Sequence, residues 1–106
     1  MPFEERSLDL VTKGYSPLAE EIERVVREKN AAPQRPDEPR VIWEEDRYTN
    51  RIKVSVIWDR WQGVDPEMRG RIIVDAVERA RGQDVARKIS LALGVTPEQA
   101  ERLGVG

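Results

Sequence analysis

The residues best suited to binding chemistry lie between positions 58 and 71 of this 106-residue chain. Trp58 and Trp61 offer ring faces on which a ligand could stack. An Arg-Gly-Arg triplet, residues 69–71, supplies two guanidinium groups able to bind carboxylates or phosphates. The candidate partner-binding residues of this stretch are Arg60, Trp61, Gly63, Arg69, Gly70 and Arg71.

The two tryptophans also have a purely structural explanation. Trp58 is in phase with Ile52, Val54 and Val56 of an expected strand, which favours burial with the indole N–H at an edge. Trp61 follows that strand and is less constrained. The alternative is an exposed stacking platform, and packing is the favoured interpretation.

The Arg-Gly-Arg triplet has a structural explanation of the same kind. A solvated helix face would let Arg69 and Arg71 pair with acidic neighbours, namely Asp65, Glu67 and Asp75. The functional alternative is a contact patch near the strand-to-helix turn. Gly70 costs about 1 kcal/mol in a helix interior relative to Ala. It would either allow another backbone to approach closely or lie in a first turn that tolerates it.

The side-chain composition limits what else the chain can do. It contains no His and no Cys, which removes the usual zinc ligands, the ligands of iron–sulfur clusters and the commonest general base. Carboxylate sites for hard cations remain open. The net charge of −2 predicts no general affinity for phosphate backbones. We therefore expect no catalytic residues, no metal site and no cofactor.

The location of the protein is also an expectation from sequence. No apolar run approaches the roughly 20 residues needed to span a bilayer. The first ten residues have neither a basic n-region nor an apolar h-region. These features predict a cytoplasmic protein that does not bind a membrane.

The pattern along the chain predicts one α+β domain over residues 17–106, preceded by a flexible arm at 1–16. Residues 16–30 favour a helix, with Ser16 as N-cap and Pro17 at the first helical position. A proline-rich linker follows at 31–39. The linker is expected to reposition the chain within the domain.

Two strands and the longest helix come next. Residues 40–46 and 50–59 alternate apolar and polar side chains on either side of the tetrapeptide RYTN, which predicts a β-hairpin. Residues 65–82 carry an apolar stripe at helical spacing, with Asp65 as cap and Gly82 at the end. Glu44 and Asp46 on one strand face could cradle a cation, but we favour a charged edge that prevents sheet-to-sheet aggregation.

The C-terminal quarter leaves two alternatives open. Residues 84–94 fit a helix at some positions and an alternating strand at others. Thr96 and Gln99 then form a capping box that starts a last short helix. A helix over 84–94 would produce something like a helix-turn-helix, whereas a strand would complete a three-stranded sheet.

The stretch from Lys53 to Gln99 resembles the BolA family. The segments KVSVIWD, RWQGVDPEM, RGRIIVDAV and KISLALGVTPEQA are similar to that family's Val-rich strand, aromatic-x-Gly turn, Arg-His-Arg triplet with helix, and short strand running into TPEE. The resemblance implies a type II KH-like α+β fold in the order α-β-β-α-β-α. The sheet would have three strands, or two if residues 88–93 are helical, with helices on one face.

The resemblance also implies a function. BolA proteins partner monothiol glutaredoxins in iron–sulfur trafficking, and some are DNA-binding regulators. Gly70 stands where the family carries histidine, so this chain is not expected to ligate a cluster itself. The prediction is a non-catalytic adaptor or regulatory binding protein with a protein partner, its oligomeric state left open. The alternative is a nucleic-acid-binding regulator that uses a KH-like or C-terminal helix-turn-helix-like element.

Overall fold

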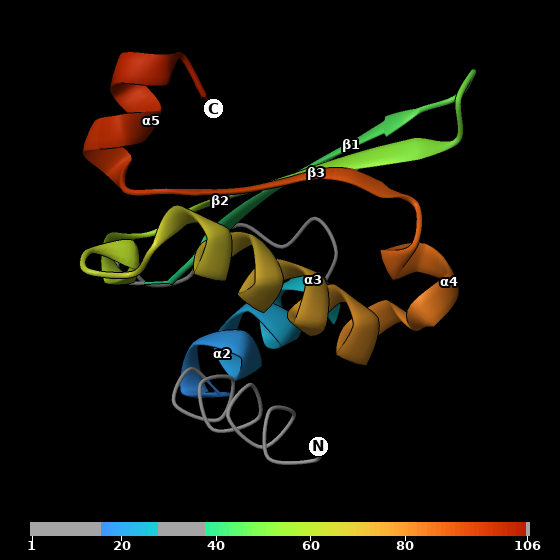
Figure 1. The fold of residues 1–106 in the computed structure, drawn as a ribbon, viewed down its shortest axis with the longest axis horizontal. Coiled ribbons are helices and arrows are strands. Elements are labelled where there is room, and N and C mark those ends of the chain that lie inside the picture. Colours follow the sequence, from blue (N-terminus) through green and yellow to red (C-terminus); the bar gives the residue numbers. More distant parts are fainter. Residues whose placement is uncertain (1–15, 28–37, 106) are drawn as a thin grey trace, which may run out of the picture.

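The computed structural model describes residues 16–27 and 38–105, which form an α+β fold with a three-stranded sheet (Figure 1). The predicted arm at 1–16 and linker at 31–39 fall largely on residues outside this description. The predicted order of elements is confirmed, with a short helix α4 added before the third strand. In chain order the elements are α2 (Ser16–Arg27), β1 (Arg40–Asp46), β2 (Arg51–Ile57), the 3-10 turn η1 (Asp59–Trp61), α3 (Pro66–Arg81), α4 (Gln83–Ala86), β3 (Ile89–Val95) and α5 (Pro97–Leu103).

The sheet is mixed and has the order β1-β2-β3. Strands β1 and β2 are antiparallel and joined by the predicted hairpin, whereas β3 runs parallel to β2. The ambiguous segment thus divides into two parts. Residues 83–86 are helical and residues 89–95 pair with the Val-rich strand β2, so the helix-turn-helix does not form.

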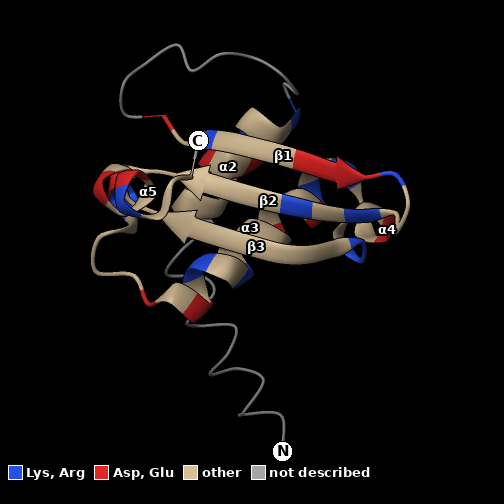
Figure 2. Cartoon of the chain, turned by 90° about the horizontal axis from the view of Figure 1, so that it is seen from above, with Lys and Arg blue, Asp and Glu red and all other residues tan. Residues whose placement is uncertain are grey.

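The core lies between one face of the sheet and the helices α2 and α3, which lie on the same side in Figure 1. Val54 and Val56 of β2 are fully buried there, as the predicted alternation requires. Ile73 and Val77 of α3 are also fully buried and pack in the same core cluster. Helix α5 lies on the other side of the sheet, beyond the end of β3, and no other described helix covers that second face (Figure 2). None of the described helices is both long and apolar enough to cross a bilayer.

Candidate partner-binding surfaces

The two tryptophans of the η1 turn belong to the interior. Trp61 is fully buried, and its indole Nε1 donates a hydrogen bond of 3.0 Å to the carbonyl of Val56. Trp58 is 2% exposed and its ring meets that of Trp61 edge-on, with centroids 5.5 Å apart. The Arg60 guanidinium covers the Trp58 ring from 5.2 Å. The packing interpretation is confirmed, and the exposed platform does not exist.

The predicted solvated position of Arg69 is wrong. Arg69 is only 7% exposed, and its guanidinium donates hydrogen bonds to two backbone carbonyls. Nε donates to the carbonyl of Val64 over 2.8 Å, and Nη1 donates to that of Gly94 over 3.2 Å. These acceptors lie in the segment before α3 and near the end of β3. The pairing expected with Asp75 is also wrong, because that carboxylate binds Arg79 instead, at 3.0 Å.

Arg69 also holds helix α5 in place. The predicted capping box is present, with the amide of Gln99 donating to Thr96 Oγ1 and the amide of Thr96 donating to Gln99 Oε1. Arg69 Nη1 donates to the same Oε1 atom over 2.9 Å. One side chain therefore joins α3, the end of β3 and the first turn of α5.

The six predicted partner-binding residues therefore fall into an interior group and an accessible group. Trp61 and Arg69 are interior, and no partner can reach them in this structure. The exposed members are Arg60 and Gly63 at the turn and Arg71 on α3, while Gly70 is half-buried. A Cβ at Gly70 would lie 3.3 Å from the carbonyl oxygen of Ala92 on β3. Of the two explanations for this glycine, close approach of another backbone is the one that the structure supports.

Gly70 and Arg71 lie in an open groove between α3 and the outer edge of β3, which we call the α3–β3 groove. Its volume is about 510 Å³. The half-buried residues Val74 and Ala92 give it apolar surface, and the charged side chains of α3 flank that surface. The groove is lined by Glu67, Gly70, Arg71, Val74, Asp75, Glu78 and Ala92. Glu67, Val74 and Glu78 were not predicted as a group, although their spacing places them on one helix face.

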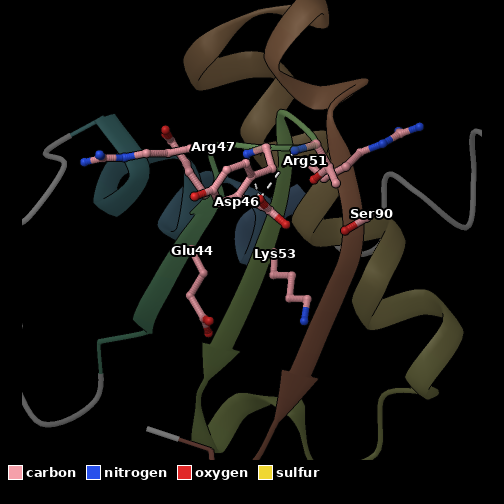
Figure 3. A pocket seen from close by; sticks show the side chains of 9 residues that line it. Glu44, Asp46, Arg47, Arg51, Lys53 and Ser90 are labelled. Carbon is pink, nitrogen blue, oxygen red and sulfur yellow. Dashed lines mark hydrogen bonds between the residues drawn. The ribbon is translucent and has the colours of Figure 1, made fainter.

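A second exposed region lies at the turn between β1 and β2. A hollow of about 590 Å³ opens there on the sheet face that α2 and α3 leave uncovered (Figure 3). Tyr48 at the turn is fully exposed. The Asp46 carboxylate accepts hydrogen bonds from the amides of Tyr48 and Thr49, at 2.9 and 3.4 Å, and these bonds lower the pKa of Asp46. The Asp46 carboxylate therefore stabilises the turn between β1 and β2.

Basic side chains surround this turn. Arg47, Arg51 and Lys53 line the first hollow, and Lys88 joins two of them around a second hollow of about 360 Å³. None of these four forms an ion pair with another described residue. Figure 2 shows blue segments at the end of the sheet where β1 and β2 meet, beside the acidic end of β1. We call the region formed by Arg47, Tyr48, Arg51, Lys53 and Lys88 the hairpin end.

The region around Glu44 and Asp46 does not form a metal site. These two carboxylates do share one face of β1, as predicted, but no described group of three or more acidic side chains is arranged to hold a metal ion.

Comparison with protein-family models, curated proteins and solved structures finds no match for this chain. Its two exposed regions are therefore interpreted from their own geometry.

Proposed function

We propose that this chain is a cytoplasmic, non-catalytic adaptor or regulatory binding protein of the BolA-like, KH-like kind, whose protein partner binds in the α3–β3 groove. The observation that carries the proposal is the groove itself. Half-buried apolar surface at Val74 and Ala92 lies beside the charged side chains of α3, and apolar surface with a polar margin is the usual organisation of a protein interface. Arg71 and Gly70, two of the predicted contact residues, line it.

Two further features support the adaptor proposal. The order α-β-β-α-β-α and the three-stranded sheet agree with what the BolA resemblance implies for the fold. The chain also lacks His and Cys, so it offers neither the family's imidazole at Gly70 nor a thiolate nucleophile. A role in contacting a partner fits this set of side chains better than a role in ligating a cluster.

Site-specific photo-cross-linking in the source cell tests the proposal. We expect a photoreactive phenylalanine at position 74 or 71 to give a discrete adduct with another protein. The same group at the exposed position 102 on α5 is the matched control and should give none. Absence of any adduct at 71 and 74, or an identical adduct at 102, would rule the groove out as the partner site.

Nucleic-acid binding is the second candidate function, and the hairpin end is the observation that favours it. A fully exposed aromatic ring at Tyr48 stands among basic side chains that form no ion pair with another described residue. Single-stranded nucleic acids bind to such combinations, because bases stack on the ring and phosphates meet the cations. This surface is separate from the helix-turn-helix element considered from sequence.

Fluorescence anisotropy with a labelled oligouridylate and a labelled oligothymidylate tests this second function. We expect affinity to fall steeply as salt is raised. Tyr48→Ala should weaken binding about tenfold, which is within the roughly 1–3 kcal/mol of one stacked base. Arg71→Ala, which removes an exposed cation outside the hairpin end, should change affinity far less. No binding at low salt would exclude the function.

A further inference from the structure

We propose that the α3–β3 groove recognises an extended peptide segment. This segment carries one basic side chain on each side of a central apolar side chain. This inference rests on the proposed function, since it names the chemistry of the partner at the same site. Three features support it. They are two exposed carboxylates on α3, the apolar surface between them, and the contacts that α3 already makes with backbone carbonyls of β3.

The two carboxylates lie at opposite ends of one stripe along α3. Glu67, Val74 and Glu78 are separated by seven and four residues, so they fall on the same side of the helix. Eleven residues at about 1.5 Å rise place Glu67 and Glu78 about 16 Å apart along the axis. Between them the groove is lined by the half-buried residues Gly70, Val74 and Ala92.

The charges of the groove favour separated cations over a continuous basic run. Glu67 and Glu78 are exposed, and neither forms an ion pair with another described residue. Asp75 is already engaged by Arg79. Arg71 lies between the two terminal carboxylates and would repel a cation placed over the middle of the groove. A partner segment should therefore carry its positive charges at the ends and an uncharged residue at the centre.

The dimensions indicate an extended conformation. In a strand, residues i, i+2 and i+4 point to the same side and span about 13 Å. Long, flexible Lys or Arg side chains at i and i+4 can splay to reach carboxylates about 16 Å apart. An apolar residue at i+2 then meets Val74 and Ala92. The pattern is basic-x-apolar-x-basic.

The edge of β3 limits what the backbone of the partner can contribute. The Gly94 carbonyl already accepts a hydrogen bond from Arg69, and the Ala92 carbonyl is close to Gly70. Addition of a full strand to this edge is thus obstructed at its C-terminal part. Recognition has to come mainly from side chains, which makes the charge pattern the decisive feature. The same carboxylates repel phosphates, so a nucleic acid is not the expected occupant.

An NMR titration of the full chain with a synthetic peptide tests the inference. The probe is Lys-Ala-Val-Ala-Lys with blocked termini, and its control is Glu-Ala-Val-Ala-Glu. We expect the lysine peptide to shift the amide signals of residues 67–78 and of Ala92, and to bind at least tenfold more tightly than the glutamate peptide. Equal binding of both peptides, shifts confined to the hairpin end, or no binding would overturn the inference.

Charge reversal supplies the matched variants. Glu67→Lys with Glu78→Lys should abolish binding of the lysine peptide and create binding of the glutamate peptide. Glu98→Lys with Glu101→Lys, which reverses two exposed carboxylates on α5, should leave the lysine peptide bound. A cross-link at position 74 that persists while the lysine peptide fails to bind would overturn the basic-peptide inference alone. Loss of both would overturn the proposed function as well.

Discussion

Arg69→Ala is expected to lower the free energy of unfolding by about 3 kcal/mol, because it removes the shared donor of three acceptors. The carbonyls of Val64 and Gly94 and the Gln99 amide oxygen all bond to this one guanidinium. Each lost hydrogen bond to a charged donor costs about 1.5 kcal/mol or more. Relief from burying a charge without a carboxylate partner offsets part of that loss. Urea denaturation measures the change.

Two other variants separate this explanation from a general effect of charge. Arg69→Lys should recover little stability, because an ammonium group lacks the planar fork that reaches separated acceptors. Arg71→Ala removes the same charge from an exposed position two residues further along the helix. It should change the free energy of unfolding by no more than about 0.5 kcal/mol. Equal effects of the alanine variants at 69 and 71 would contradict the structural role of Arg69.

The loosening of α5 gives an independent readout of the same role. Few contacts hold this helix besides buried Ala100 and the bond from Arg69 to Gln99. In Arg69→Ala, the amide exchange of residues 98–103 should accelerate more than that of β2. Uniform acceleration in both elements would instead indicate global destabilisation only.

The regular elements could be predicted because their patterns are local. The period-two alternation of β2 and the Thr96–Gln99 capping box depend on residues within a few positions of one another, and both are present. For the third strand the sequence allowed two alternatives, because the residues before it are helical and the strand itself gains its partner from the distant β2. Segment 83–95 carries both signals because it contains both structures.

The position of Arg69 was missed because its acceptors come from distant parts of the chain. Residues 64, 94 and 99 surround one side chain only after β3 has paired and α5 has begun. A local signal existed nevertheless. Arg69 lies three and four residues before Ile72 and Ile73, on the buried stripe of α3, whereas Arg71 does not. An arginine at a core position of the helical pattern indicates burial with partners.

The distinctive residues of the predicted site have structural roles, so the proposed partner-binding surface lies on neighbouring residues of α3. The residues with the most distinctive side chains, Trp61 and Arg69, fix the arrangement of the turn, β3 and α5. The residues left accessible beside them, Gly70 and Arg71, are presented by that framework at the edge of β3. The proposed binding residues lie on the regular helix α3 and would need little ordering when a partner arrives, which favours affinity from a small surface.

A second large effect is expected at Gly94, where β3 passes over the junction of Trp61 and Arg69. A Cβ at this position would lie 2.9 Å from both Trp61 Cε2 and Arg69 Cβ, and 3.1 Å from Trp61 Nε1. Neither neighbour can move away cheaply, since Trp61 is fully buried and bonded to Val56. Gly94→Ala should therefore destabilise the protein by about 2–3 kcal/mol through overpacking.

Gly70→Ala is the matched control for this overpacking. Its added Cβ would meet only the carbonyl of Ala92, at 3.3 Å. The gain of about 1 kcal/mol in helix propensity opposes that tight contact, so the net change should stay within about 1 kcal/mol of zero. Urea denaturation followed by tryptophan fluorescence reports both variants, with a shifted native spectrum expected only for Gly94→Ala. A stability of Gly94→Ala equal to that of Gly70→Ala would show that the turn accommodates the methyl group, and would refute the packing argument for Trp61.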